Sequence, residues 1–248
     1  MSQGREVTIR VKRYRPEKGD EPYFQEYRIR VRKDMVVLDA LNYIKDHMDG
    51  SLTYRWSCRM GVCGSCGMMV DGEPVLTCAT FLRSLRSTVT VEPLRYFPIV
   101  KDLVVDSSEF MHKISKVKPW IIRKDEKPPD EGEYPQTPLE VELYKQFSMC
   151  INCMICYSAC PVYGLDTNFV GPAASALAYR YIQDTRDQGR DERLSTLLGH
   201  DGIWECTFIG ECSTACPKDV DPALAIQRLK ILGAQKTLRA LLLPLQRR

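Results

Sequence analysis

The sequence lacks several features that mark common classes of protein. Among its 248 residues, the longest apolar stretch near the C-terminus is 238–245, which contains Arg239 and Pro244. That stretch is far shorter than the ~20 residues needed to span a bilayer. The N-terminal residues have neither the apolar core nor the cleavage site of a signal peptide. We therefore expect a chain that does not cross the membrane and stays in the reducing cytosol.

An excess of charge of one sign and a catalytic constellation are also missing. The 35 basic and 32 acidic residues are interspersed and leave a net charge of +3, so no nucleic acid partner is expected. The three histidines, His47, His112 and His200, are scattered singly, as surface or helix-end histidines are. No glycine-rich phosphate loop and no Ser/His/Asp set is present, and no catalytic residue is predicted.

Cysteine, by contrast, is abundant, and its spacing indicates metal. Eleven cysteines are an odd number and cannot all pair as disulfides. Cys150, Cys153, Cys156 and Cys160, followed by Pro161, have the C-x2-C-x2-C-x3-C-P spacing of bacterial ferredoxins. The three close cysteines can surround one iron–sulfur cube, while the cysteine before the proline points to a second cluster. A zinc site, the alternative, would favour two pairs of ligands around one tetrahedron.

A second group of cysteines lies earlier in the chain. Cys58, Cys63, Cys66 and Cys78 follow the pattern C-x4-C-x2-C-x11-C, and the first three match the plant-type [2Fe-2S] spacing. The fourth arrives from a separate strand, after a hairpin turned at residues 71–72. All four ligands are cysteine and no histidine lies nearby, which excludes a Rieske centre.

Three glycines, Gly61, Gly64 and Gly67, interrupt this second group. Because they have no side chain, they let backbone N–H groups turn inward and hydrogen-bond the sulfurs of a cluster. A zinc ribbon, the alternative here, has no use for such a glycine-rich loop. The group is therefore predicted to hold a [2Fe-2S] cluster.

The last cysteines repeat the ferredoxin run with one ligand missing. By the same spacing its ligands fall at 206, 209, 212 and 216, and position 209 is isoleucine. In a two-cluster ferredoxin each run gives its Cys-Pro cysteine to the other cluster. The predicted [4Fe-4S] ligands are Cys150, Cys153, Cys156 and Cys216. The predicted [3Fe-4S] ligands are Cys160, Cys206 and Cys212. Sets of four, four and three account for all eleven cysteines.

The three-ligand set leaves one alternative open. A labile [4Fe-4S] cluster with water at the open corner would need a polar, substrate-binding surround. Ile209 beside Phe208 offers none, which favours [3Fe-4S].

The pattern of apolar residues predicts an α+β protein with two domains. Alternation predicts strands at 7–11 and 27–31 that form a hairpin turned near residues 19–20. A helix capped by Asp34 and ended by Gly50 follows, and Val89 and Val91 close the sheet. This order is typical of a β-grasp fold, so residues 1–105 are predicted to form a plant-type [2Fe-2S] ferredoxin domain.

Residues 106–248 are predicted to form a helical domain built like an enlarged bacterial ferredoxin. We expect helices over 101–117 and 139–147, with a proline-rich extended connector over about 119–138 between them. Three further helices are expected: one that begins at Pro172, a short one that ends near Leu198, and a final one that begins at Pro222.

Three clusters of different type on one chain would conduct single electrons between partners. The sequence resembles the iron–sulfur subunit of succinate dehydrogenase and fumarate reductase, the complex II family. Residues 55–67 (RWSCRMGVCGSCG), 150–161 and 212–218 carry this resemblance, which covers nearly the whole chain. It implies a flavoprotein partner with covalent FAD and the dicarboxylate site, and a membrane anchor where quinone binds near the [3Fe-4S] cluster. It also implies a peripheral position on the cytoplasmic face of the bacterial inner membrane.

The quinone end looks more like the fumarate reductase type. Ubiquinone-reducing members have a tryptophan a few residues after the Cys-Pro position and a histidine after the Cys206 position, where this chain has Leu165 and Thr207. The resemblance implies a menaquinone site formed by Pro161, Thr207, Phe208, Gln227 and Lys230. Gln227 and Lys230 lie three apart on the final helix and can share one face; an exposed polar pair is the alternative.

Two other functions fit the sequence less well. A cluster subunit of another flavoprotein oxidoreductase would typically lack the plant-type domain in front of this second half. An iron–sulfur regulatory or storage protein would need an effector or DNA-binding element, and no basic helix is found. The direction of the relay, succinate oxidation or fumarate reduction, stays open because sequence gives no cluster potentials.

Overall fold

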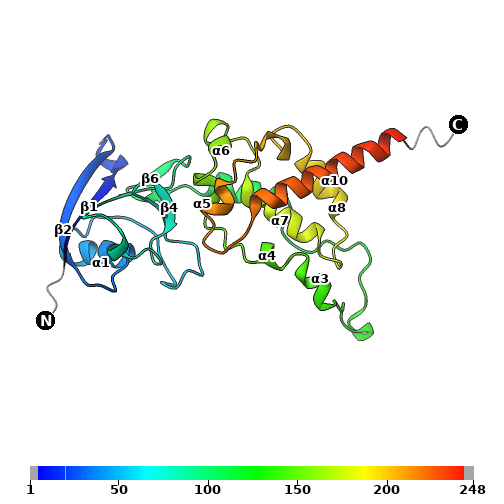
Figure 1. Ribbon diagram of the computed structural model, residues 1–248, viewed down its shortest axis with the longest axis horizontal. Helices are drawn as coiled ribbons and strands as arrows, with labels where there is room; N and C mark the ends of the chain where they lie inside the picture. The colour runs from blue at the N-terminus through cyan, green and yellow to red at the C-terminus, as the bar shows by residue number, and fades with distance from the viewer. Residues whose placement is uncertain (1–4, 20, 243–248) are drawn as a thin grey trace. The chain divides into compact units, whose positions relative to one another are not determined.

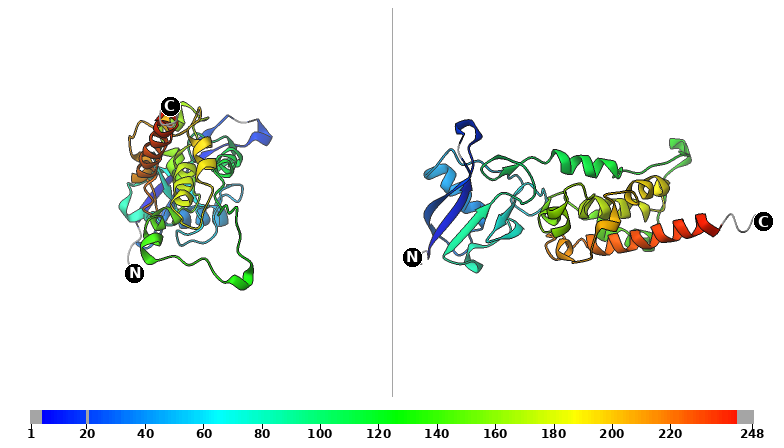
Figure 2. Two further views of the ribbon diagram at one scale, coloured as in Figure 1. Left: turned by 90° about the vertical axis from the view of Figure 1, so that its right-hand side faces the viewer. Right: turned by 90° about the horizontal axis from the view of Figure 1, so that it is seen from above.

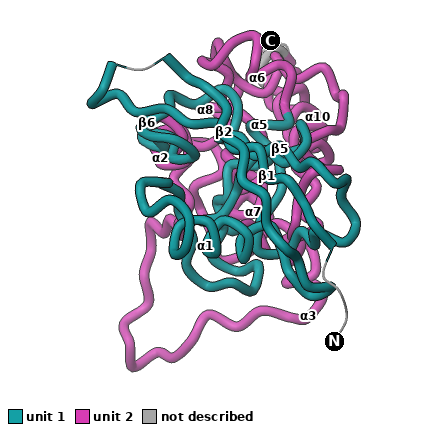
Figure 3. Tube along the Cα trace, turned by 90° about the vertical axis from the view of Figure 1, so that its left-hand side faces the viewer, with its two compact units in different colours: residues 1–108, 151–159 teal, residues 109–150, 160–248 magenta. Residues whose placement is uncertain are grey.

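The computed structural model describes residues 5–19 and 21–242. Outside them lie the start of the N-terminal segment, Asp20 of the predicted turn, and residues 243–245 of the apolar stretch. The chain divides into two compact units (Figure 3): residues 1–108 with 151–159, and residues 109–150 with 160–248. The predicted boundary at 105/106 stays a prediction. No helix among the described residues is long and apolar enough to cross a membrane.

Unit 1 is built on a mixed five-stranded sheet of order β2-β1-β5-β3-β4. The strands are β1 (Arg5–Arg13), β2 (Tyr23–Val31), β3 (Gly67–Val70), β4 (Glu73–Leu76) and β5 (Thr88–Glu92). β1 pairs antiparallel with β2 and parallel with β5. Alternate residues such as Val7 and Ile9 are buried, as the period of two predicts. The predicted strands, and the hairpin at Asp71–Gly72 between β3 and β4, are confirmed.

Helix α1 (Val37–His47) covers this sheet and buries Val37, Leu41 and Ile44 in its core. The predicted cap at Asp34 is wrong. The helix begins three residues later, after the extended residue Val36, whose N–H donates to Asp39 Oδ2 at 3.1 Å. A carboxylate in the first turn thus satisfies the free backbone donor that Asp34 was expected to satisfy.

The helix predicted over 101–117 is wrong for its first half. Residues 99–105 form a small hairpin of β6 (Ile99–Lys101) and β7 (Val104–Val105), and α2 spans only Ser108–Lys116. The turn lies at Asp102, which has a φ of 46° and a side chain that is wholly buried. Asp102 accepts hydrogen bonds from Arg13, Tyr14 and Thr53, and this buried network decides the local conformation.

Residues 151–159 belong to unit 1 and pack on its other part, residues 1–108, although the two are remote in sequence. They contain α5 (Ile155–Ser158), which lies against β4. Ser158 Oγ donates to the carbonyl of Arg95 at 3.1 Å, and the rings of Tyr157 and Phe97 lie 6.4 Å apart.

Unit 2 is helical, as predicted. Besides α2 it contains α3 (Pro138–Glu142), α4 (Lys145–Ser148), α6 (Pro161–Leu165), α7 (Pro172–Ile182), α8 (Arg190–Leu197), α9 (Glu211–Thr214) and α10 (Pro222–Leu242). The small buried residues of α7, such as Ala174 and Ala178, let α10 pack closely beside it, as Figures 1 and 2 show. The single helix predicted over 139–147 is instead two short helices, interrupted at Leu143 and Tyr144.

The connector is extended over most of its length, with one short 3-10 turn at Pro129–Glu131. Its start is held by Arg193 of α8, which is buried and pairs with Asp187 at 2.7 Å. The same guanidinium donates to the carbonyls of Val117, Lys118 and Trp120. Arg193 therefore satisfies backbone carbonyls that a chain without secondary structure leaves unpaired.

Candidate metal centres

The first cysteine group of unit 1 forms a loop in which backbone donors face sulfur. The N–H groups of Met60, Val62 and Cys63 point to Cys58 Sγ at 3.3–3.4 Å. The N–H of Cys58 in turn points to Cys63 Sγ at 3.4 Å. Such donors stabilise a thiolate over a thiol, and the one from Cys58 is the main reason that the pKa of Cys63 falls to about 6.

Cys66 and Cys78 are brought together by the β3–β4 hairpin. Cys66 immediately precedes β3 and Cys78 follows β4, and Thr77 N donates to the Cys66 carbonyl at 3.1 Å. Burial, followed by a hydrogen bond with the Cys66 thiol, raises the pKa of Cys78 to about 11. The charge of Cys58 also acts on Cys78, and Cys58 in turn contacts Cys63, so these contacts link the four cysteines of the predicted [2Fe-2S] set.

Two of the three glycines of this loop have the left-handed backbone conformation that glycine favours. Gly61 has a φ of +68°, and its backbone N–H donates to the sulfur of Cys78. Gly64 has a φ of +73°. Gly67 is different, because it begins β3 with ordinary strand geometry. A Cβ on Gly67 would lie 3.0 Å from the carbonyl oxygen of Cys153, so its role is close approach rather than backbone conformation.

The two ferredoxin-like runs repeat each other in local conformation. Asn152 and Met154 have φ of 53° and 65°, and Phe208 and Gly210, at the same places in the second run, have 61° and 89°. Each run then enters a one-turn helix, α5 or α9. Ile209 therefore occupies the backbone position that Cys153 occupies in the first run. Ile209 is 57% exposed.

Cys160, Cys206 and Cys212 come together in unit 2. Burial raises the pKa of Cys212 to about 12, and the nearby sulfurs of Cys160 and Cys206 add to the shift. Burial also raises the pKa of Cys160, with Cys206 as a neighbouring charge. Backbone donors from Tyr163 to Cys160 Sγ at 3.5 Å and from Phe208 to Cys206 Sγ at 3.4 Å complete the site.

These sulfur environments fit iron–sulfur ligation. Backbone donors to sulfur offset the charge of thiolate-bound iron, and apolar burial keeps water away. Within residues 5–19 and 21–242 no three His, Cys, Asp or Glu side chains stand close enough for a single metal ion. A cluster spaces its ligands more widely than one ion does.

The four predicted [4Fe-4S] cysteines are divided between the two units. Cys153 and Cys156 are buried in unit 1, whereas Cys150 and Cys216 are half-buried in unit 2. That these four ligate one cluster stays a prediction.

The predicted quinone residues lie at the Cys206 end of unit 2. Lys230 Nζ donates to the carbonyl of Cys206 at 2.7 Å. Gln227, one turn earlier on α10, has a buried Nε2 without a hydrogen-bond partner. Phe208 is 58% exposed. Pro161 begins α6, and Thr207 lies between Cys206 and Phe208.

Trp204 was not among the residues predicted for this end of unit 2. Its half-exposed ring lies 5.9 Å from Lys230 Nζ, within the range of a cation–π contact. The available signal was its place two residues before the predicted ligand Cys206.

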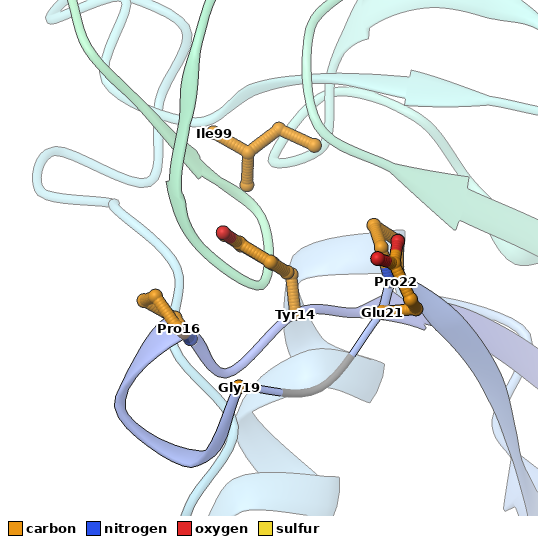
Figure 4. Close-up of a pocket in the computed structure, with 6 residues that line it drawn as sticks. All are labelled: Tyr14, Pro16, Gly19, Glu21, Pro22 and Ile99. Atoms are coloured by element: carbon orange, nitrogen blue, oxygen red, sulfur yellow. The ribbon is translucent and has the colours of Figure 1, made fainter.

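Two hollows in the described part of the surface lie apart from the cysteines. One, of about 440 Å³, is in unit 1 (Figure 4) and is lined by Tyr14, Pro16, Gly19, Glu21, Pro22 and Ile99. The other, of about 760 Å³, lies in unit 2 between α8 and α10. No cysteine lines either of them, so neither belongs to the predicted centres.

Known families and relatives agree with these centres. Residues 8–112 match the family of 2Fe-2S iron–sulfur cluster binding domains, and residues 146–220 match the 4Fe-4S dicluster domains. The fumarate reductase iron–sulfur subunit of Mycobacterium tuberculosis is 58% identical, over 96% of this chain and 97% of its own length. That identity over nearly the full length decides the family. The chain belongs to the fumarate reductase and succinate dehydrogenase iron–sulfur subunits.

Other members of the family give the same result. The fumarate reductase iron–sulfur subunit of Escherichia coli O6:H1 is 47% identical over 98% of this chain and all of its own length. The succinate dehydrogenase iron–sulfur subunit of Coxiella burnetii is 37% identical over 93% and 98%. A chain of the Sdh1 complex of Mycobacterium smegmatis matches the structure with a TM-score of 0.85 and 26% identity, over 94% and 97%. The predicted α+β fold and the predicted family of oxidoreductase subunits are confirmed.

Proposed function

We propose that this chain relays single electrons between a FAD-containing dicarboxylate subunit and quinone in the membrane, as the iron–sulfur subunit of a succinate:quinone oxidoreductase. The observation that carries the proposal is the gathering of two cysteine sets, one in each unit, on a chain of this family. When bound, iron–sulfur clusters supply one-electron acceptance and release. The chain's own residues hold the sulfurs, donate N–H groups to them and exclude water.

We further propose the ligand sets predicted from spacing. Cys58, Cys63, Cys66 and Cys78 hold [2Fe-2S]. Cys150, Cys153, Cys156 and Cys216 hold [4Fe-4S]. Cys160, Cys206 and Cys212 hold [3Fe-4S]. The last assignment is supported by the repeated backbone conformation, since Ile209 stands where a fourth sulfur would stand and offers iron no ligand.

The quinone is proposed to bind beside Cys206, near Pro161, Thr207, Phe208, Gln227 and Lys230, with menaquinone favoured. The free N–H of Gln227 and the ammonium of Lys230 are donors suited to a quinone carbonyl. Trp204, Phe208 and Ile209 add an exposed apolar surface around them. Such a surface suits an integral membrane anchor. The chain is proposed to be held there as a peripheral subunit, on the cytoplasmic face of the bacterial inner membrane.

The relay run in reverse, as quinol:fumarate reductase, is the second candidate. It is favoured by the relatives at 58% and 47% identity, whose names are fumarate reductase subunits. Both directions use the same centres, because the direction depends on the potentials of the clusters and the quinone.

The test is an EPR-monitored redox titration of the purified native complex with added menaquinone or ubiquinone. Three cluster signals, a co-purified flavoprotein and a small membrane subunit are expected, with potentials that indicate the quinone and the direction. A chain that purifies with its full iron content but without a flavoprotein contradicts the proposal.

A further inference from the structure

Two of the cysteine segments touch each other within unit 1. The loop of Cys58, Cys63 and Cys66 meets residues 151–159 at Gly64. A Cβ built on Gly64 would lie 2.8 Å from the carbonyl oxygen of Ile151, 2.9 Å from Cys153 Cβ and 3.0 Å from Cys153 Cα. The backbone of one cysteine loop therefore lies directly on a cysteine of the other, with room for a hydrogen atom and nothing larger.

The contact is part of a docked surface rather than a chance approach. Gly67, three residues on, places a hypothetical Cβ 3.0 Å from the Cys153 carbonyl oxygen and 3.6 Å from Ile155 Cγ1. The hydrogen bond from Ser158 Oγ to the Arg95 carbonyl holds the far end of the same segment. Figure 3 colours residues 151–159 with 1–108, as one compact unit.

A side chain at Gly64 would have to move Cys153. Carbon atoms in ordinary contact are at least ~3.5 Å apart, so the 2.9 Å approach to Cys153 Cβ would have to open by about 0.6 Å. The atoms in the way are backbone and a Cβ, which cannot rotate aside as the end of a flexible side chain can. Glycine at 64 therefore fixes the distance between the two segments.

We propose that Gly64 is a positioning residue that sets the spacing between the [2Fe-2S] loop and Cys153, and so the rate at which an electron crosses between them. The inference rests on the proposed function, because it takes the four [2Fe-2S] cysteines as ligands of one centre and Cys153 as a ligand of the next. One electron is lost on the Cys63–Cys66 side and one is gained on the Cys153 side, and no proton or bond changes. The crossing contains a single non-bonded step, and transfer across such a step slows exponentially as the gap widens.

Three alanine variants of the intact complex separate spacing from backbone strain. Gly64→Ala introduces both the overlap with Cys153 and the cost of a left-handed residue. Gly61→Ala introduces the strain alone, since Gly61 has a φ of +68° and a Cβ there would meet nothing within 4 Å. Gly67→Ala introduces the approach to Cys153 alone, because Gly67 has ordinary strand geometry.

The measurements are iron and sulfide content, the low-temperature spin relaxation of the reduced [2Fe-2S] EPR signal, and the rate of electron exchange between centres after flash reduction. Gly64→Ala is expected to keep its iron and its potentials while the [2Fe-2S] signal relaxes more slowly and the exchange rate falls. Gly67→Ala is expected to slow the relaxation and the electron exchange as well, but by less than Gly64→Ala does. Gly61→Ala keeps the backbone N–H that faces the Cys78 sulfur, and its new Cβ meets nothing, so the spacing to Cys153 and the relaxation rate are expected to stay those of the parent.

Relaxation and exchange unchanged in both Gly64→Ala and Gly67→Ala, with the clusters present, would overturn the inference and leave the proposed function intact. An equal change in Gly61→Ala would also overturn it, because strain would then explain the result. If Gly64→Ala fails to assemble, Gly67→Ala is compared with Gly61→Ala. Slower relaxation in Gly67→Ala alone supports the inference, and equal relaxation in the two overturns it. A parent complex without these EPR signals would instead refute the proposed function itself.

Discussion

Arg13 Nε donates to Oδ1 of Asp102 at 2.9 Å, and this pair joins two buried side chains that are 89 residues apart in the sequence. Arg13 is 1% exposed and Asp102 is fully buried. Asp102 also accepts from the N–H groups of Tyr14 and Thr53, so its carboxylate ties the ends of β1 and β6 to the segment that leads into the cysteine loop.

Asp102→Ala is expected to destabilise unit 1 by about 1–3 kcal/mol, because the N–H groups of Tyr14 and Thr53 lose their buried acceptor. The Arg13 guanidinium loses one of its two carboxylate partners and keeps Asp49 at 2.6 Å. The measurement is the midpoint of urea unfolding, together with iron retained at the [2Fe-2S] site. The control is the neighbouring Lys101→Ala, which removes a surface ion pair with Glu17 that water screens. Equal stability of the two variants would show that the buried pair contributes nothing.

Tyr54→Phe is expected to change the response of unit 1 to high pH. Burial, with a smaller effect of the Asp46 charge, raises the pKa of Tyr54 to about 12, and its hydroxyl donates to Asn42 Oδ1 at 2.7 Å. A raised tyrosine pKa stabilises the folded chain below the unfolded value near ~10, and that stability is lost as the pH rises from ~10 to about 12.

At neutral pH the loss of the Tyr54 hydrogen bond is therefore expected to cost about 0.5–1.5 kcal/mol, and the difference from the parent should shrink above pH ~10. Unfolding midpoints on both sides of that pH give the trend. The difference between the ultraviolet tyrosinate titrations of parent and variant reports Tyr54 alone among the 12 tyrosines. A Tyr54 that titrates at the ordinary value contradicts the prediction.

Gly202→Ala is expected to destabilise unit 2 although Gly202 has an ordinary φ of −86°. A Cβ there would overlap the carbonyl oxygen of Leu197 and lie 2.7 Å from that of Gly199. Overpacking against backbone costs about 1–3 kcal/mol or more. Gly199→Ala is the matched control, because its nearest contact would be an ordinary 3.7 Å. Thermal unfolding of the two variants should differ; a similar midpoint would mean that the 197–202 turn relaxes freely.

Ile209→Cys is expected to convert the predicted three-iron site to a four-iron site. The position has the backbone conformation of Cys153, so a thiolate there supplies the missing ligand. EPR of the oxidised complex should lose the [3Fe-4S] signal, and the iron content should rise by one atom. Thr214→Cys adds an exposed thiol away from the ligand position and should leave the signal as it is. Persistence of the parent signal in Ile209→Cys would show that residue 209 is not the missing ligand position.

Lys230→Leu is expected to slow quinone-coupled turnover and to spare succinate-to-dye activity, because dyes do not need the quinone site. Lys230 Nζ stands at the Cys206 carbonyl, whereas Lys236 on the same helix pairs with exposed Asp191 at 3.0 Å. Lys236→Leu is therefore the control for loss of charge on α10. An equal fall of both activities in Lys230→Leu would argue for a general role at the cluster rather than at the quinone.

The sequence by itself determined the features that depend on short-range spacing. Alternating residues gave β1 and β2, the Asp71–Gly72 pair gave the β3–β4 hairpin, and Pro172 and Pro222 marked the starts of α7 and α10. The repeated cysteine spacing also carried the family, because ligand loops are set by a few adjacent residues and their backbone angles. The gap at Ile209 was visible for the same reason.

Only the tertiary structure decided the features that depend on partners remote in sequence. Residues 101–107 were predicted to begin a helix, yet 99–105 form a hairpin because Asp102 is drawn to Arg13, and a buried charge pair outweighs local propensity. Spacing likewise showed Cys153 only as part of its own run. Its contact with Gly64 arises because residues 151–159 dock on unit 1, and such contacts between distant segments leave no periodic pattern in a single sequence.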